Sequence, residues 1–122
     1  MPLYGPRGFG RLSQPVEDPA LGDISWVAFD GNGAVQGHEN VASITDSGSG
    51  DFTITWACAF ATASSYAVAL CSSVANPFTA TSGHFDAIQA ITAGTVRTSF
   101  LDYNSAAATD PTLIYLTAIG EH

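Results

Sequence analysis

Residue types that could form a hydrolytic site occur in this sequence, but no local signature connects them. Serines are abundant, and His84, Asp86 and Asp102 could supply a base and an orienting acid. A nucleophilic serine must lie within hydrogen-bond reach of a histidine that a third group orients. The sequence has no Gly-x-Ser-x-Gly segment, which marks the strained turn of many such serines. Because a serine-rich β protein supplies these triples by composition alone, we predict no catalytic residues and no enzyme activity.

The side chains that could bind zinc are scattered. His38, His84 and His122 form no His-x-His pair, and Cys58 and Cys71 are 13 positions apart rather than in a Cys-x-x-Cys motif. Structural zinc sites draw on closely spaced ligands, so we predict no metal and no cofactor. We expect two reduced, buried thiols that pack as small apolar groups. Whether the two cysteines form a disulfide is an alternative that the sequence leaves open, because a disulfide requires their strands to be neighbours.

Two aspartates flank a loop rich in glycine and serine, which could suggest calcium. They are Asp46 and Asp51, at the ends of Asp46-Ser47-Gly48-Ser49-Gly50. The loop lacks the spaced oxygen ligands and the terminal glutamate of a calcium-binding hand. Aspartate accepts backbone N–H bonds in tight loops, and this is the role we predict for both.

The first 22 residues have the composition of an arm rather than of a folded unit. Four of the six prolines lie here, and proline removes a backbone donor and fixes φ. Aromatic rings and guanidinium groups, which are enriched where interfaces bury most energy, stand close together in this arm: Tyr4, Arg7, Phe9 and Arg11. We predict that these four residues dock the protein onto a partner. The alternative is a frayed N-terminus without function.

From Asp23 onward the pattern has period two, which predicts half-buried strands. Glycine-rich turn signals at residues 30–33 and 46–50 separate them. The expected strands cover residues 24–29, 35–39, 41–45, 52–56, 66–72, 95–103 and 113–119. Residues 84–91 fit either a strand or a turn of helix. We therefore predict an all-β, antiparallel β-sandwich-like domain over residues 23–122, preceded by an extended arm at 1–22.

Aromatic and apolar positions on these strands provide the expected core and contacts. We assign Trp26 and Trp56 to the core, while a ring that is exposed could instead stack on a sugar. Residues 113–119 are apolar on both faces, so that strand is central in a sheet or covered by a partner. Ile114 and Leu116 are therefore predicted to lie at a subunit contact.

Arg97 is the one positive charge of residues 23–122, against nine acids. Its expected partners are Asp86, Asp102 or an acid on another chain. A pair buried at a subunit contact would be costly to break, whereas a surface pair would matter little. The sequence leaves these alternatives open, and Arg97 is counted as a candidate subunit contact.

The composition bounds the function classes further. The 122 residues fit one domain, and they carry 46% hydrophobic but only 11% charged residues, with a net charge of −8 and no lysine. Binding to nucleic acid requires a cationic protein surface, and binding to an anionic membrane requires one too. We therefore expect neither partner. No run of 18 apolar residues and no signal peptide are found. We expect assembly in a cytoplasm.

Two long segments resemble a β-rich domain that recurs in tailed-bacteriophage genomes, often in tail-fibre and other virion proteins. They are residues 26–56 and 95–120. The first opens with Trp-x-x-Phe-Asp-Gly-x-Gly and continues with Ser-Ile-Thr-Asp-x-Gly-x-Gly-Asp-Phe-Thr at 43–53. The second has a Val-Arg-Thr strand, a polar loop and a final apolar strand. Together the similarity spans most of residues 24–120.

This resemblance implies a structural or adsorption role in a virion, with no catalysis and often as a trimer. The expected function is a short fibre or spike module on the tail or baseplate, in contact with other virion proteins and with further copies of itself. A capsid decoration protein that stabilises the shell is the alternative in the same class. A module that binds a host surface glycan is the alternative in another class.

Overall fold

The computed structural model describes residues 23–73, 84–102, 105 and 107–122. These residues form eight β-strands and no helix, so the predicted all-β, sandwich-like class is confirmed. The predicted arm at 1–22, with Tyr4, Arg7, Phe9 and Arg11, lies outside the described residues.

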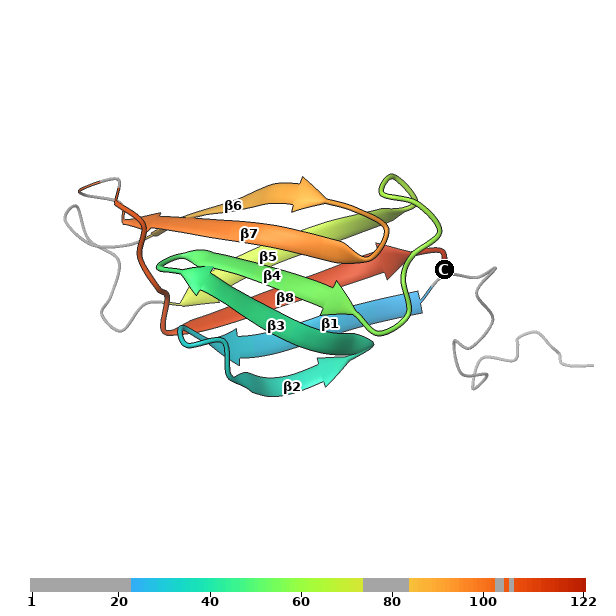
Figure 1. The fold of residues 1–122 in the computed structure, drawn as a ribbon, viewed down its shortest axis with the longest axis horizontal. Coiled ribbons are helices and arrows are strands. Elements are labelled where there is room, and N and C mark those ends of the chain that lie inside the picture. Colours follow the sequence, from blue (N-terminus) through green and yellow to red (C-terminus); the bar gives the residue numbers. More distant parts are fainter. Residues whose placement is uncertain (1–22, 74–83, 103–104, 106) are drawn as a thin grey trace, which may run out of the picture.

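The strands form two four-stranded antiparallel sheets that lie one over the other (Figure 1). The first sheet has the order β2-β1-β8-β5, with bounds β1 (Asp23–Asp30), β2 (Val35–Glu39), β5 (Tyr66–Ser73) and β8 (Leu113–Gly120). The second has the order β3-β4-β7-β6, with bounds β3 (Val41–Gly48), β4 (Asp51–Trp56), β6 (His84–Ile91) and β7 (Thr95–Asp102). Residues 84–91, which the sequence left between strand and helix, form strand β6.

The space between the sheets is filled by side chains that alternate along each strand. Phe29, Phe52 and Phe100 form its centre, with edge-to-face ring contacts at centroid distances of 5.2 Å for Phe29–Phe52 and 6.1 Å for Phe52–Phe100. Such geometry adds to the burial of each ring. The other buried apolar residues are Val27, Val41, Ile54, Trp56, Phe60, Tyr66, Val96, Ile114, Leu116 and Ala118.

Both predicted hairpin turns are present. In the β1–β2 turn, Asp30 Oδ1 accepts the N–H groups of Asn32 and Ala34, each at 2.9 Å, and Gly33 has a φ of 82°. In the β3–β4 turn, Asp46 Oδ1 accepts the N–H of Gly48 at 3.0 Å. Asp46 therefore has the turn role predicted for it. The β3 strand continues three residues further than expected, to Gly48.

Candidate interaction face

The outward side of the first sheet carries a mainly apolar set of residues, here called the apolar face. Strand register aligns them in three rows across the sheet, and a fourth outward row, Asp30, Leu113 and Ser73, borders them at one end. One row holds Ile24, Ile119 and Ala67; the second Glu39, Trp26, Thr117 and Ala69; the third Gly37, Ala28, Tyr115 and Cys71. Glu39, on the edge strand β2, is the one charged residue of these three rows.

Four large side chains of the apolar face are open to solvent. Their exposed fractions are 55% for Ile24, 41% for Trp26, 43% for Tyr115 and 55% for Ile119. The two isoleucines face each other across β1 and β8. Contiguous exposed apolar patches of this kind mark surfaces that meet another molecule.

Large and small side chains are separated on this face. The large ones stand on β1 and β8, whereas β5 presents Ala67, Ala69 and Cys71 outward. The two central strands therefore form a ridge, and β5 forms a lower border beside it.

The outward side of the second sheet is different in chemistry. It is rich in hydroxyl groups, which alternate with the core residues of β3, β4 and β7: Ser43, Thr45, Thr53, Thr55, Thr95 and Ser99. Its exposed large apolar residues are Phe85 and Leu101, which face each other on β6 and β7. Hydroxyls keep their hydrogen bonds to water, so the part of this side formed by β3, β4 and the outward residues of β7 other than Leu101 is suited to solvent.

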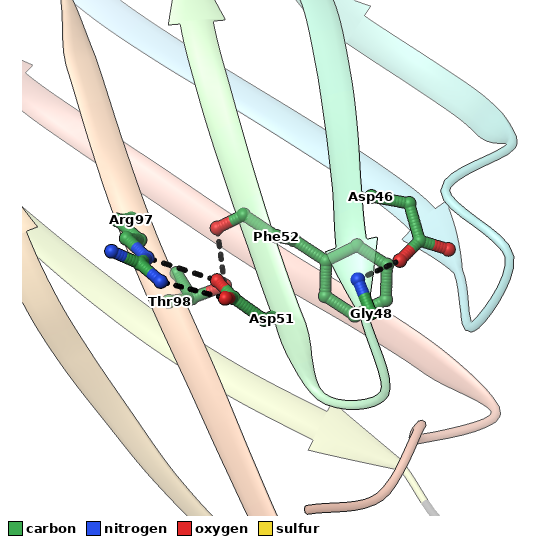
Figure 2. A network of polar contacts seen from close by, with 6 residues as sticks. All are labelled: Asp46, Gly48, Asp51, Phe52, Arg97 and Thr98. Carbon is green, nitrogen blue, oxygen red and sulfur yellow. Dashed lines mark hydrogen bonds and ion pairs between the residues drawn. The ribbon is translucent and has the colours of Figure 1, made fainter.

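Arg97 lies on this polar side and pairs with Asp51 (Figure 2). Its Nε donates to Asp51 Oδ1 at 3.0 Å and its Nη2 to Oδ2 at 2.7 Å. These hydrogen bonds, together with the positive charge, lower the pKa of the Asp51 carboxyl below its usual value, against a smaller opposing effect of burial. The partner of Arg97 is therefore Asp51 and not Asp86 or Asp102, the two acids expected from the sequence. Asp51 was predicted to accept backbone N–H bonds in the loop, and its observed role is this ion pair.

The structure corrects two of the predicted contact residues. Ile114 and Leu116 are 0% and 1% exposed, because they face the core between the sheets. The residues of β8 that face outward are Tyr115, Thr117 and Ile119. The prediction chose the wrong face of a strand that is apolar on both. Arg97 remains exposed, although its guanidinium is engaged by Asp51 of the same chain.

The two tryptophans, both predicted for the core, have different positions. Trp56 is 4% exposed, as predicted, whereas Trp26 lies on the apolar face. Its ring covers Gly37 of β2, where an added Cβ would come within 3.0 Å of it. The inward residues of β1 are Ser25, Val27 and Phe29.

Both cysteines are free and exposed, which contradicts their predicted burial. Cys71 belongs to the apolar face. Cys58 lies away from it, in the segment after β4, where its N–H donates to Asn40 Oδ1 at 2.7 Å. Their locations on separate parts of the surface explain why they do not pair.

Asn40 joins the two sheets at a corner, a role that the sequence analysis missed. It has a φ of 63° between β2 and β3. Its Nδ2 donates to the fully buried Ser25 Oγ at 2.9 Å and to the Cys58 carbonyl at 3.0 Å. His122 Nε2 lies 3.1 Å from the same nitrogen. A lone asparagine between two strand patterns was the available signal, since asparagine tolerates this conformation.

An aromatic stack closes the same end of the sandwich. Phe60 stacks on Tyr66 at 3.9 Å and on His122 at 4.3 Å between ring centroids. The Trp56 Nε1–H donates to the Tyr66 hydroxyl at 3.3 Å, and that hydroxyl donates to the Thr92 carbonyl at 2.7 Å. Burial raises the pKa of Tyr66, against a smaller lowering by the bond from Trp56. These contacts stabilise the end of the sandwich and indicate a structural role for the four aromatic rings.

The acids considered for catalysis also have structural partners. The Ser72 hydroxyl donates to both oxygens of Asp86, at 2.8 and 3.0 Å, and so links β5 to β6. Asp102 Oδ1 accepts the N–H of Ser105 at 3.0 Å. Within the described ranges, no group of three or more His, Cys, Asp or Glu side chains is arranged to hold a metal. The described part of the chain also has no helix long and apolar enough to span a membrane.

Comparisons of the chain with protein-family models, with curated proteins and with solved structures found no match. The candidate site is therefore defined by its own chemistry: an open, almost uncharged sheet face on a molecule with a net charge of −8.

Proposed function

We propose that this chain is a structural module of a tailed-bacteriophage virion, acting as a short fibre or spike on the tail or baseplate. The observation that carries the proposal is the apolar face, whose large side chains are left open on an otherwise completed sandwich. A face of this kind favours contact with protein over contact with water. The resemblance of residues 26–56 and 95–120 to phage virion domains supplies the setting.

In this role the chain binds and does not catalyse. Many copies on one particle turn a weak contact into a firm one, because the later contacts form at high effective concentration. The arm at 1–22 docks the module onto its neighbours through Tyr4, Arg7, Phe9 and Arg11. A capsid decoration protein would use the same arm and the same apolar face, with its copies bound to the capsid shell instead of the tail or baseplate.

The test is incorporation into particles. Deletion of residues 2–12 should remove the protein from purified virions, measured by quantitative mass spectrometry. A matched control, the double substitution Ser13→Ala and Gln14→Ala in the same arm, should incorporate normally. Undiminished incorporation of the deletion variant would reject docking by the arm, and absence of the intact protein from virions would reject the virion role. Copy number then separates the two locations, since decoration requires copies over the whole shell.

A glycan-binding module is the second candidate, and one observation favours it: the exposed ring of Trp26. Aromatic faces offer a flat apolar surface to a sugar ring, with a polar N–H at the edge. A glycan array that gives binding by the intact protein and none by Trp26→Ala would support this candidate. Turnover of a capsule polysaccharide would contradict both proposals.

A further inference from the structure

We infer that the apolar face is the contact between two copies of this chain, packed face to face about a two-fold axis that runs along β8. The inference rests on the proposed role of the chain as one of many copies in an assembly, and it names the surface through which neighbouring copies meet.

Charge selects this face for self-association. Each copy has a net charge of −8, so most pairs of surfaces repel one another. The acids with described side chains stand mainly in turns and at strand ends, as Asp30, Asp46 and Asp110 do. In the three rows of the apolar face only Glu39 is charged, and it lies on the outermost strand. This is the surface where two copies can approach with least repulsion.

Shape complementarity follows from the symmetry. Rotation about an axis along β8 places β1 of one copy over β5 of the other and leaves β8 over β8. Because the rows are kept, Ile24 then faces Ala67 of the second copy, and Trp26 faces its Ala69. Each large residue of β1 therefore meets a small residue of β5, and each copy supplies both halves, as an isologous contact requires. On the axis strand β8, Ile119 and Tyr115 meet the same residues of the second copy.

The size of the face sets the strength of the contact. In this arrangement β2 lies outside the overlap, and the contact is formed by β1, β8 and β5. Three strands about 4.8 Å apart, with about 3.3 Å per residue, outline a face on the order of 400 Å². Stable interfaces bury about 800 Å² on each partner. A face below this value predicts a reversible dimer that is populated at high protein concentration. The two-fold symmetry predicts a pair of chains, in place of the trimer that the family resemblance implies.

Sedimentation equilibrium of the full chain over a range of concentrations tests the inference. The wild type should move from the mass of one chain to that of two. Ile119→Asp, which places a charge on the axis strand, should weaken association at least tenfold. The matched control is Leu101→Asp, the same kind of change at a 40% exposed residue on the outward side of the second sheet, and it should associate as the wild type does. If Ile119→Asp fails to fold by circular dichroism, Tyr115→Ser replaces it.

Three results would overturn the inference. The first is a wild type that stays monomeric at every concentration. If deletion of residues 2–22 then produces a dimer, the arm of the same chain is the occupant of the face. The second is equal weakening by Leu101→Asp and Ile119→Asp, and the third is a limiting mass of three chains. None of these results alters the incorporation test, so a failure here is distinct from a failure of the virion role.

Discussion

Trp26 lies over Gly37, so closely that a Cβ at Gly37 would come within 3.0 Å of the indole ring. The glycine on the edge strand makes room for a ring that stays on the outward side of the sheet. A large aromatic residue is thereby held 41% exposed on the apolar face. This arrangement is typical of a contact residue and not of a core residue.

The two tryptophans should respond differently to truncation. Trp56→Ala removes a ring that is 4% exposed, and we expect a loss of roughly 3–5 kcal/mol in the free energy of unfolding. Trp26→Ala should cost clearly less, because it leaves no cavity between the sheets. Urea unfolding of dilute, monomeric protein measures both. Equal losses would show that Trp26 belongs to the core after all.

Tyr66→Phe should reveal the hydrogen bonds that the hydroxyl makes. The substitution leaves the Trp56 Nε1–H and the Thr92 carbonyl without this partner, and we expect a loss of roughly 1–3 kcal/mol for such buried groups. Thermal unfolding monitored by circular dichroism measures the loss. Unchanged stability would show that the hydroxyl is replaceable at this position.

The raised pKa of Tyr66 also predicts a dependence on alkaline pH. The neutral phenol is favoured in the folded state, so its contribution is complete below the ordinary value of 10.0 and is lost as the pH rises above it. In a titration of phenolate absorbance, one tyrosine should ionise at higher pH than in the unfolded chain. Tyr66→Phe should remove that transition, and its persistence would assign the shift to another tyrosine.

The Arg97–Asp51 pair predicts a dependence at the acidic end. Because the pKa of Asp51 is lowered, the contribution of the pair is present above the usual value of 3.8 and is lost as the pH falls through the lowered value. Carboxyl NMR should show the pKa of Asp51 rising in Arg97→Gln, with Asp51→Asn as the assignment control. Since Arg97 is half exposed, salt should weaken the effect. An unchanged pKa would exclude the guanidinium as its cause.

Two substitutions of Asn40 separate its contribution to stability into a conformational part and a hydrogen-bonding part. Asn40→Gly keeps the φ of 63° accessible but removes the bonds to Ser25 and Cys58. We expect a loss of roughly 1–3 kcal/mol, mainly because the buried Ser25 hydroxyl loses its partner. Asn40→Ala should lose about 1–2 kcal/mol more, because a left-handed conformation is unfavourable for alanine. Chemical unfolding of the two variants measures the hydrogen-bonding and the conformational contributions to stability. Equal stabilities of Asn40→Gly and Asn40→Ala would show that the left-handed conformation contributes nothing.

Local pattern was enough to predict the strands and the hairpins. Period-two alternation and the Asp30-Gly31-Asn32-Gly33 turn depend on neighbouring residues, so the sequence expresses them directly. The side of a strand that faces the core is a different matter when both sides are apolar. In β8, a shift of one residue separates Ile114 from Tyr115, and only the second sheet decides which is buried.

The partners of the polar residues required the topology. Asp51 and Arg97 are 46 residues apart and meet because β4 and β7 are neighbours. The expected partners of Arg97, Asp86 and Asp102, lie closer to it along the chain. Trp26 was assigned inward because aromatic residues usually fill β cores, whereas here Val27 and Phe29 fill it. Two of the misassigned side chains, Trp26 and Cys71, lie on the apolar face, where the period-two pattern alone does not show which side of the strand is buried.

The two free thiols allow a direct test of whether protein covers the apolar face. Cys71 belongs to this face and Cys58 does not, and both are exposed in the single chain. The measurement is the rate of maleimide modification of each cysteine, resolved by peptide mass spectrometry, over a range of protein concentrations. The account predicts that modification of Cys71 slows as the concentration rises while that of Cys58 stays constant. Equal, concentration-independent rates would contradict it.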